Sequence, residues 1–174
     1  MAWQVDTAHT QISFGIQHLG ISFIRGSFRV ADAQLELDES RPENSKLTAR
    51  IDVASLDTRD ATRDGHLKTA DFFDVEKFPF MVFQTKRIAN QGNGKFDVTG
   101  DLTIKDVTRE IVLRGEYRGP AHDPISGKRK VGFLLTGEIY REQFGMDWNV
   151  PMQPVGMMLA NSVSVQIDAQ AIEA

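Results

Sequence analysis

Apolar and polar residues alternate with a period of two along most of this chain, and this pattern constrains the fold more than any other feature. The alternation is clear at Ile12, Phe14 and Ile16, which polar or small residues separate. Successive side chains of a β-strand point to opposite faces, so such a segment is apolar on one face only. The same alternation recurs in the ranges 33–37, 47–53, 96–104, 111–117, 131–139 and 163–171. With the run from Phe80 to Ile88, the sequence predicts about eight strands.

The segments between the predicted strands indicate antiparallel pairing. Residues 90–94 (Asn-Gln-Gly-Asn-Gly) and the stretch from Gly119-Pro120 to Gly127 have the composition of hairpin turns, and residues 38–44 form another surface loop. A parallel pair would need a long crossover connection, usually a helix, and no long amphipathic helix separates the strands. We therefore predict an all-β, mostly antiparallel meander.

About eight one-faced strands close most economically into a barrel. Closure leaves no unpaired edge, and an eight-stranded barrel is wide enough for side chains or one small ligand. A two-sheet sandwich is the competing architecture. A strand of eleven residues spans roughly 36 Å at about 3.3 Å per residue, which is longer than a sandwich usually needs and favours the barrel.

Charge and composition exclude several classes of protein. The net charge is −4 and no basic block is present, so we expect no nucleic-acid partner. The chain has no Cys, which excludes disulfides, thiolate metal sites and Cys nucleophiles. No apolar run approaches the roughly 20 residues of a transmembrane helix, and the N-terminal residues do not resemble a secretory signal. From these features we expect a cytoplasmic protein.

Two connections are longer than hairpin turns, and long structured loops are often functional. The first spans residues 55–79, and we expect it to contain a short helix capped by Asp57, with Asp60 in its first turn. The second spans residues 144–161. We expect this second loop to move over an apolar pocket as a gate, because Gly145 and Gly156 are suited to act as hinges; a fixed plug that seals one end of the barrel is the alternative. The large apolar residues of the loop are Met146, Trp148, Met152, Met157 and Met158.

No catalytic or metal-binding motif is evident. The four histidines (His9, His18, His66, His122) are not spaced to ligate one metal ion, and nucleophile-elbow and phosphate-loop motifs are absent. The sequence Arg63-Asp64-Gly65-His66 could serve acid–base chemistry, but adjacency alone does not bring these groups onto a substrate. We predict instead that His18, Arg63 and His66 meet a ligand head group or water, unless Arg63 pairs with Asp60 or Asp64. A binding protein without a cofactor is favoured over an enzyme.

Phe accounts for 11 of the 15 aromatic residues, the others being 2 Trp and 2 Tyr. Phe has no polar group, so an interior rich in Phe suits a ligand that offers few hydrogen bonds. An ordinary filled core is the alternative interpretation. If a cavity is present, the apolar parity of the strands predicts its main lining residues, which are Phe14, Ile16, Phe28, Leu102, Phe133 and Leu135.

Several motifs resemble those of the YceI-like family of polyisoprenoid-binding, lipocalin-like proteins. They cover nearly the whole chain in the family's order. They include Asp6-Thr-Ala-His9, Arg25-Gly-Ser-Phe28, Ile51-Asp-Val-Ala-Ser55, Arg63-Asp-x-His66-Leu67, Ala70-Asp-Phe-Phe-Asp-Val75, Val98-Thr-Gly-Asp-Leu-Thr-Ile104 and Arg141-x-x-Phe144-Gly145.

This resemblance implies an extended eight-stranded antiparallel barrel with a lipocalin-like interior. It also implies a long amphiphile as ligand: a polyprenyl chain, an isoprenoid quinone or a fatty-acid-like lipid. Phe72 and Phe144, which lie in two of the motifs, join His18, Arg63, His66, Met146, Trp148 and Met157 as candidate ligand-binding residues. Many family members carry a signal peptide, and from the N-terminal residues we expect none here. The resemblance also allows a homodimer. The alternatives are an enzyme acting on a lipid or small molecule at the barrel mouth, and a sandwich-type interaction module with a filled core.

Overall fold

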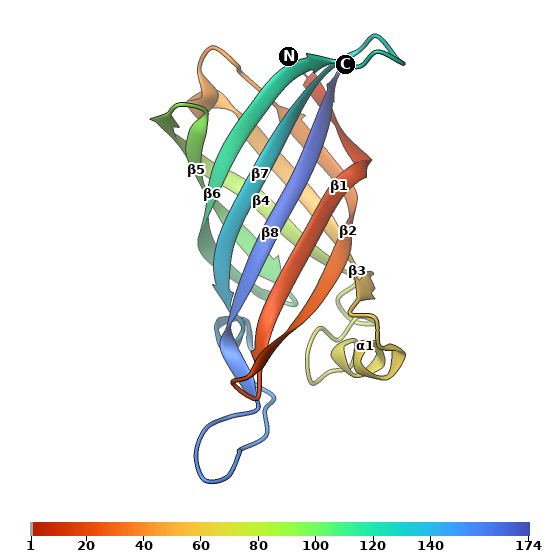
Figure 1. Cartoon of the computed structure of the whole chain (residues 1–174), viewed down its shortest axis with the longest axis vertical. Helices are drawn as coiled ribbons and strands as arrows, with labels where there is room; N and C mark the ends of the chain where they lie inside the picture. The colour runs from red at the N-terminus through yellow and green to blue at the C-terminus, as the bar shows by residue number, and fades with distance from the viewer. Residues whose placement is uncertain (1) are drawn as a thin grey trace.

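Eight strands follow one another around a closed antiparallel barrel (Figure 1). The computed structural model describes residues 2–174. Each strand pairs with its neighbours in sequence, and β1 pairs with β8 to close the barrel, so the predicted architecture is confirmed. The strands are β1 (Ala2–His18), β2 (Ser22–Glu36), β3 (Lys46–Asp57), β4 (Phe80–Gly92), β5 (Lys95–Ile104), β6 (Val107–His122), β7 (Arg129–Tyr140) and β8 (Leu159–Glu173).

The barrel has two distinct ends. Both termini and the β6–β7 turn lie at one end, which we call the terminus end (Figure 1). The helix α1 (Ala61–Leu67), the β1–β2 turn and the loop between β7 and β8 lie at the other end, which we call the helix end. Two short 3-10 helices, η1 (Pro42–Asn44) and η2 (Arg141–Phe144), belong to the β2–β3 and β7–β8 connections.

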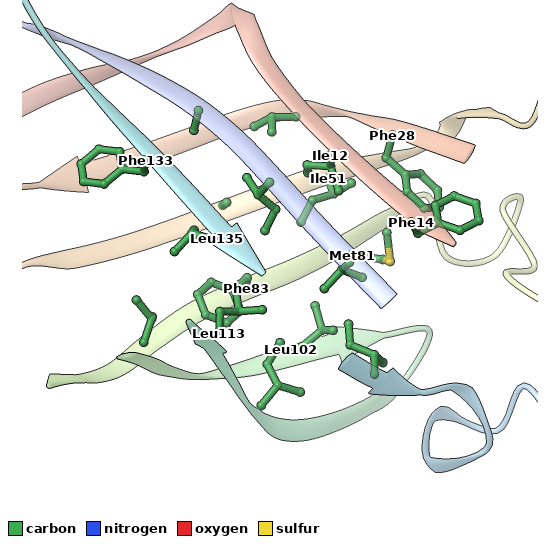
Figure 2. A pocket seen from close by; sticks show the side chains of 18 of the residues that line it. Ile12, Phe14, Phe28, Ile51, Met81, Phe83, Leu102, Leu113, Phe133 and Leu135 are labelled. Carbon is green, nitrogen blue, oxygen red and sulfur yellow. The ribbon is translucent and has the colours of Figure 1, made fainter. Parts of the chain in front are cut away.

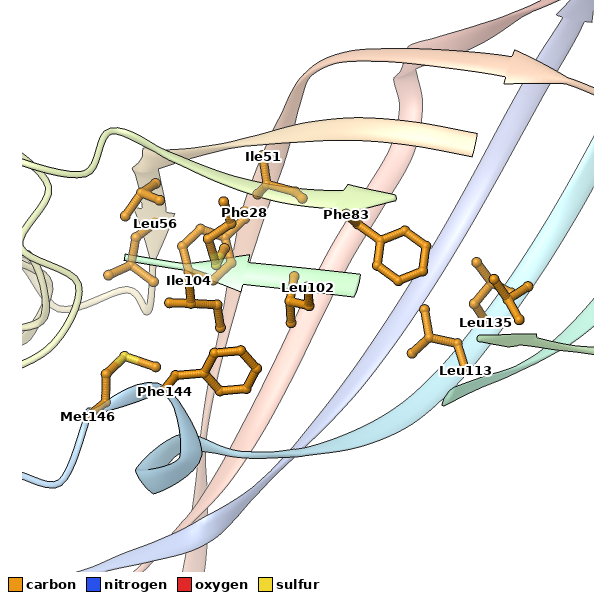
Figure 3. Close-up of a cluster of buried hydrophobic side chains, with 13 residues drawn as sticks. Phe28, Ile51, Leu56, Phe83, Leu102, Ile104, Leu113, Leu135, Phe144 and Met146 are labelled. Atoms are coloured by element: carbon orange, nitrogen blue, oxygen red, sulfur yellow. The ribbon is translucent and has the colours of Figure 1, made fainter. Parts of the chain in front are cut away.

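The apolar face of each strand points into the barrel interior. Directly opposed residues of antiparallel strands share a face, and apolar pairs such as Ile51–Met81 and Val98–Leu113 lie opposite each other. Toward the helix end the interior is filled, because Phe144 is only 1% exposed and packs with other buried side chains such as Met146 (Figure 3).

Inward-facing phenylalanines lie over glycines of neighbouring strands. A Cβ atom added to Gly26 would lie 2.5 Å from Phe14 Cζ, and one added to Gly115 would lie 2.4 Å from Phe96 Cζ. Phe83 covers Gly100 in the same way. Because glycine has no side chain, each ring can lie against the barrel wall and leave the middle of the barrel open.

We expect Gly115→Ala to destabilise the barrel by about 1–3 kcal/mol, because the new methyl group would overlap Phe96 and Leu135. Urea denaturation measures the effect. The matched control is Gly65→Ala in α1, where an added Cβ meets nothing within 4 Å. Alanine is the better helix former, so the control should gain up to about 1 kcal/mol. Equal stability of the two variants would contradict the close packing.

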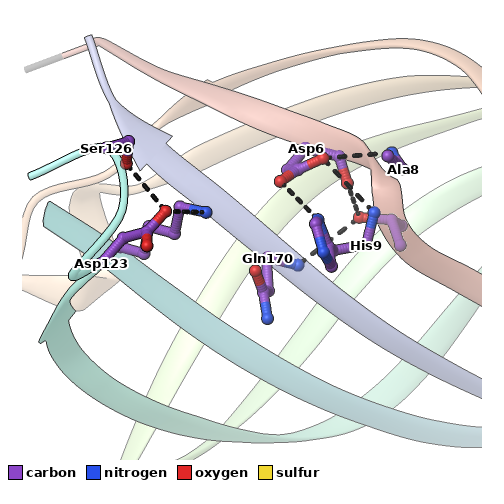
Figure 4. Close-up of polar contacts among 8 residues, drawn as sticks. Asp6, Ala8, His9, Asp123, Ser126 and Gln170 are labelled. Carbon is purple, nitrogen blue, oxygen red and sulfur yellow. Dashed lines mark hydrogen bonds and ion pairs between the residues drawn. The ribbon is translucent and has the colours of Figure 1, made fainter. Parts of the chain in front are cut away.

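The motif Asp6-Thr-Ala-His9 forms an irregularity in β1 (Figure 4). The strand register shifts between Asp6 and Gln11, and the Asp6 carboxylate accepts hydrogen bonds from the backbone N–H of Ala8 and His9. Its second oxygen lies 2.8 Å from His9 Nδ1. Burial raises the pKa of Asp6, but the interactions with His9 and Ala8 outweigh it and the net pKa is lowered. This motif therefore shapes the strand near the terminus end.

The connection between β3 and β4 contains the predicted helix, but its cap differs from the prediction. The helix begins at Ala61 and is capped by Asp60, whose side chain accepts hydrogen bonds from Thr62 N and Arg63 N. Asp57 instead accepts a hydrogen bond from Arg59 N in the turn before the helix. An N-cap immediately precedes the first helical residue, and only Asp60 holds that position.

Candidate functional site

The barrel encloses a cavity of about 640 Å³, within the range of small-molecule sites. All eight strands contribute to its wall, and the labelled side chains of Figure 2 extend into the same space. Representative lining residues from β1 to β8 are Ile12, Phe28, Ile51, Phe83, Leu102, Leu113, Leu135 and Ile167. The interior is therefore not the completely filled core of the alternative interpretation.

Polar side chains line the cavity only toward its two ends. At the terminus end the lining extends to exposed residues of the β4–β5 hairpin and of the β2–β3 connection, among them Asn90, Lys95 and Glu39. At the helix end it includes His18, Arg63, His66 and Arg141. The cavity thus has an apolar middle between two polar ends, which matches an amphiphile with a long apolar body.

Three aromatic side chains close the helix end. The ring of His66 lies edge-on to Trp148 with centroids 4.7 Å apart, and 5.2 Å from the ring of Phe72. Phe72 and Trp148 are themselves 5.5 Å apart. His66 Nε2 lies 2.8 Å from a carboxylate oxygen of Asp71, which fixes the imidazole. This cluster joins the β3–β4 connection to the β7–β8 loop across the end of the barrel.

Arg63 lies on the cavity wall at the same end. Its Nε donates to Thr58 Oγ1 at 2.8 Å and its Nη2 donates to the Thr58 carbonyl at 2.7 Å. Asp64 accepts hydrogen bonds from the backbone and hydroxyl of Thr58. Within residues 2–174 no carboxylate lies within 4 Å of Arg63, so it pairs with neither Asp60 nor Asp64. Its charge is available to a ligand.

Arg141 is a buried cation that the sequence analysis did not select. Its side chain is 3% exposed, and it donates to the carbonyls of Ala160, Met146 and Trp148 at 2.8, 2.7 and 3.0 Å. No described carboxylate forms an ion pair with it, and burial lowers the pKa of Arg141. Arg141 therefore fixes the β7–β8 loop to β8. The motif Arg141-x-x-Phe144-Gly145 was the available signal, but it did not reveal this contact.

Two buried side-chain atoms of the described chain have no hydrogen-bond partner, Arg141 Nη2 and Tyr117 Oη. Both belong to residues that line the cavity, Arg141 at the helix end and Tyr117 in the other half of the barrel. Burial, followed by the charge of Glu39, raises the pKa of Tyr117. Buried polar atoms in proteins nearly always have a partner, so each of these two atoms has a hydrogen bond to offer to a water molecule or a ligand.

The structure places all but two of the predicted site residues on the cavity wall. Phe14, Ile16, His18, Phe28, Arg63, His66, Phe72, Leu102, Phe133, Leu135, Met146 and Trp148 line it. Phe144 lies instead in the packed core, and Met157 is 55% exposed. The neighbouring Met158 lines the cavity in place of Met157.

The base of the β7–β8 loop is held by hydrogen bonds. Asn149 exchanges two of them with the backbone of Leu159, at 2.8 and 2.9 Å. Beyond this point Met158 N donates to Val150 O and Met152 N to Gly156 O, which makes the rest of the loop a small hairpin. Gating by this loop stays a prediction.

Between residues 2 and 174, no group of three or more His, Asp or Glu side chains is placed to hold a metal ion. No helix in this range is long and apolar enough to cross a membrane.

Comparisons with known proteins agree with this architecture. A UPF0312 protein of Staphylococcus aureus (strain bovine RF122 / ET3-1) is 35% identical over 95% of this chain and 94% of its own length. The YCEI protein of Campylobacter jejuni is 34% identical, with a TM-score of 0.74 over 91% of this chain and 90% of its own. BcnA of Burkholderia cenocepacia shares the fold at 23% identity, with a TM-score of 0.80 over 95% and 98% of the two chains.

A more distant structural neighbour is described as a polyisoprenoid binding domain from Saccharophagus degradans implicated in plant cell wall breakdown. It is 13% identical, with a TM-score of 0.69 over 100% of this chain and 99% of its own, and it shows the fold alone. The model of the YceI-like domain matches residues 3–171, which include every strand of the barrel except the ends of β1 and β8. The chain therefore belongs to the YceI-like family.

Proposed function

We propose that this protein binds one long-chain amphiphilic lipid inside its barrel, without catalysis. A polyisoprenoid, an isoprenoid quinone or a fatty-acid-like molecule would suit the site. The observation that carries the proposal is the cavity itself, which is apolar through its middle and polar only toward its ends. The description of the Saccharophagus degradans neighbour as polyisoprenoid-binding supports the same class of ligand. Carriage, storage, sequestration and a cytoplasmic location stay predictions.

The apolar wall of the cavity supplies affinity for a long apolar tail, so selectivity between ligands depends on the polar ends of the cavity. Each prenyl unit has five carbons and could contribute up to roughly 4 kcal/mol at about 0.8 kcal/mol per CH2. Several units would exceed the practical ceiling of about −20 kcal/mol, so the ordering of the flexible chain must offset much of this gain. We therefore expect tight binding with poor selectivity among apolar tails.

The groups with acid–base capacity at the helix end support binding better than catalysis. Asp64 is engaged by Thr58, and His66 is held by Asp71 and packed between Phe72 and Trp148. These polar contacts lie within the β3–β4 connection and stabilise its fold. If the protein were an enzyme at this end, His66→Ala should abolish turnover; under our proposal this variant still retains lipid.

Mass spectrometry of an organic extract of the purified protein tests the proposal directly. We expect a long-chain lipid at up to one molecule per barrel, absent from an unrelated protein purified in the same way. The apo protein, obtained by extraction and refolding, should then take up a polyprenyl or fatty-acyl probe. A protein that neither copurifies with lipid nor binds these probes would contradict the proposal.

We expect Arg63→Ala to weaken binding of an anionic lipid about tenfold or more, and to leave binding of a neutral quinone nearly unchanged. Hydrogen bonds to charged groups contribute about 1.5–3 kcal/mol, and Arg63 has no carboxylate partner of its own. Isothermal titration with both lipids measures the difference. Arg114→Ala, which removes an exposed cation outside the cavity lining, is the control. Equal losses for both lipids would assign Arg63 a structural role only.

A further inference from the structure

Exposed apolar side chains gather at the helix end of the barrel. Of the ten large hydrophobic residues that are exposed in the described part of the chain, six belong to the β1–β2 hairpin and the β7–β8 loop. Ile21 is 83% exposed and Val155 is 80% exposed, so they contribute little to the core. We call this set the apolar tip; it comprises Leu19, Ile21, Phe23, Val150, Val155 and Met157.

The two segments of the apolar tip are neighbours in space. Leu19 N donates a hydrogen bond to Met158 O at 2.8 Å, and His18 pairs with Leu159 where β1 meets β8. In Figure 1 both segments lie at the same end, and the β7–β8 loop extends furthest from the barrel. Their exposed side chains therefore form one protruding surface.

The tip itself is poor in charged residues. Residues 18–24 and 148–161 contain no Asp, Glu, Lys or Arg, although such residues make up 25% of the chain. Arg25 and Asp147 flank these ranges, and the Arg25 guanidinium lies 5.2 Å from the centroid of the Phe23 ring. Single exposed apolar residues are ordinary, but clustered ones indicate an interaction site. A charged side chain is costly to move into a bilayer, so an uncharged aliphatic protrusion suits contact with lipid.

The apolar tip is continuous with the cavity. His18 lines the cavity and the next residue, Leu19, is exposed; Met158 lines the cavity and the preceding Met157 is exposed. The tip therefore adjoins the helix end of the cavity. A lipid crossing between the two would pass the polar side chains of that end, His18, Arg63, His66 and Arg141, as well as apolar ones.

We propose that the apolar tip docks on the surface of a lipid bilayer and places the helix end of the cavity against the membrane, where lipid is exchanged. This inference rests on the proposed lipid binding. A bilayer is favoured over a protein partner because the tip protrudes from the end of the barrel and four of its six residues (Leu19, Ile21, Val150 and Val155) are aliphatic. Because the tip is uncharged, docking depends little on the ionic strength.

Sedimentation with vesicles of zwitterionic phosphatidylcholine tests the docking. The double variant Ile21→Asp, Val155→Asp should partition onto vesicles at least tenfold more weakly than the wild-type protein, at both low and high salt. The matched control is Ile125→Asp, because Ile125 is 95% exposed in the β6–β7 turn at the terminus end and should be irrelevant to docking. The high exposure of all three side chains means that these variants should fold normally, which circular dichroism verifies.

A second measurement separates docking from lipid binding. Fluorescent prenyl or fatty-acyl probe added from ethanol, without vesicles, should load the double variant as it loads the wild type. Transfer of the same probe from vesicles should be at least tenfold slower in the double variant. Two results would overturn the docking and leave lipid binding intact, provided that the probe loads normally from ethanol. One is equal partitioning of all three proteins onto vesicles, and the other is no partitioning of the wild-type protein. If the double variant lost only concentration-dependent self-association, the tip would join two copies of the chain and the proposal would be wrong.

Discussion

Replacement of Phe133 by Asp is expected to abolish lipid retention. Phe133 lines the cavity on β7, with its ring centroid 5.7 Å from that of Tyr117 and 6.3 Å from that of Phe96. A carboxylate at this position would be either charged and hydrated or protonated. In both states it would place a polar group against the lipid tail, which costs binding free energy. We also expect a loss of about 3 kcal/mol of stability from the missing ring.

Lipid content by mass spectrometry and stability by urea denaturation measure the two effects. Thr136→Asp is the control, since Thr136 is exposed on the same strand and lies outside the cavity lining. A soluble, folded Phe133→Asp protein that still carries a full complement of lipid would refute the placement of the ligand in the cavity.

Replacement of Arg141 by Met should lower the free energy of unfolding by about 3 kcal/mol. Three backbone carbonyls would lose their donors at once, and each unsatisfied buried acceptor costs about 1–3 kcal/mol. Relief from burying an unpaired guanidinium offsets part of this loss. Met keeps most of the side-chain volume, so the change reports mainly on the hydrogen bonds.

Amide hydrogen exchange locates the effect within the chain. Residues 145–158 should exchange faster in Arg141→Met, while the barrel strands change little below the global unfolding limit. Arg114→Met should alter stability by no more than about 0.5 kcal/mol, as is usual for an exposed position. Uniformly faster exchange along all strands would show that Arg141 supports the whole barrel and not the loop in particular.

The barrel could be predicted from the sequence because the position of a residue in a β-strand determines which face of the sheet its side chain points to. Once Phe14 is assigned to the interior, Ile12 and Ile16 must follow, and all three line the cavity. The same parity places Leu102, Phe133 and Leu135 on the wall. Eight strands joined mainly by hairpin turns then favour a closed barrel, because closure leaves no strand edge unpaired.

The ends of the cavity could not be predicted in this way. Met157 and Met158 are equivalent in type, and only the hydrogen bond between Met158 N and Val150 O decides which side each one faces. Asp57 and Asp60 are equally good caps until the first helical residue is known. The Asn90–Gly94 turn was identified as a hairpin, but its place beside the cavity depends on barrel closure. Outside regular strands, long-range contacts determine which way a side chain points.

The glycines beneath the inward-facing phenylalanines make the usable length of the cavity an adjustable property of the family. Gly26, Gly100 and Gly115 are on different strands, and each accommodates a ring that would otherwise project across the lumen. An alanine or larger residue at one of them would displace a ring inward at a defined depth without altering strand pairing. Under the proposed lipid binding, relatives with a larger residue at one of these positions should accept shorter tails.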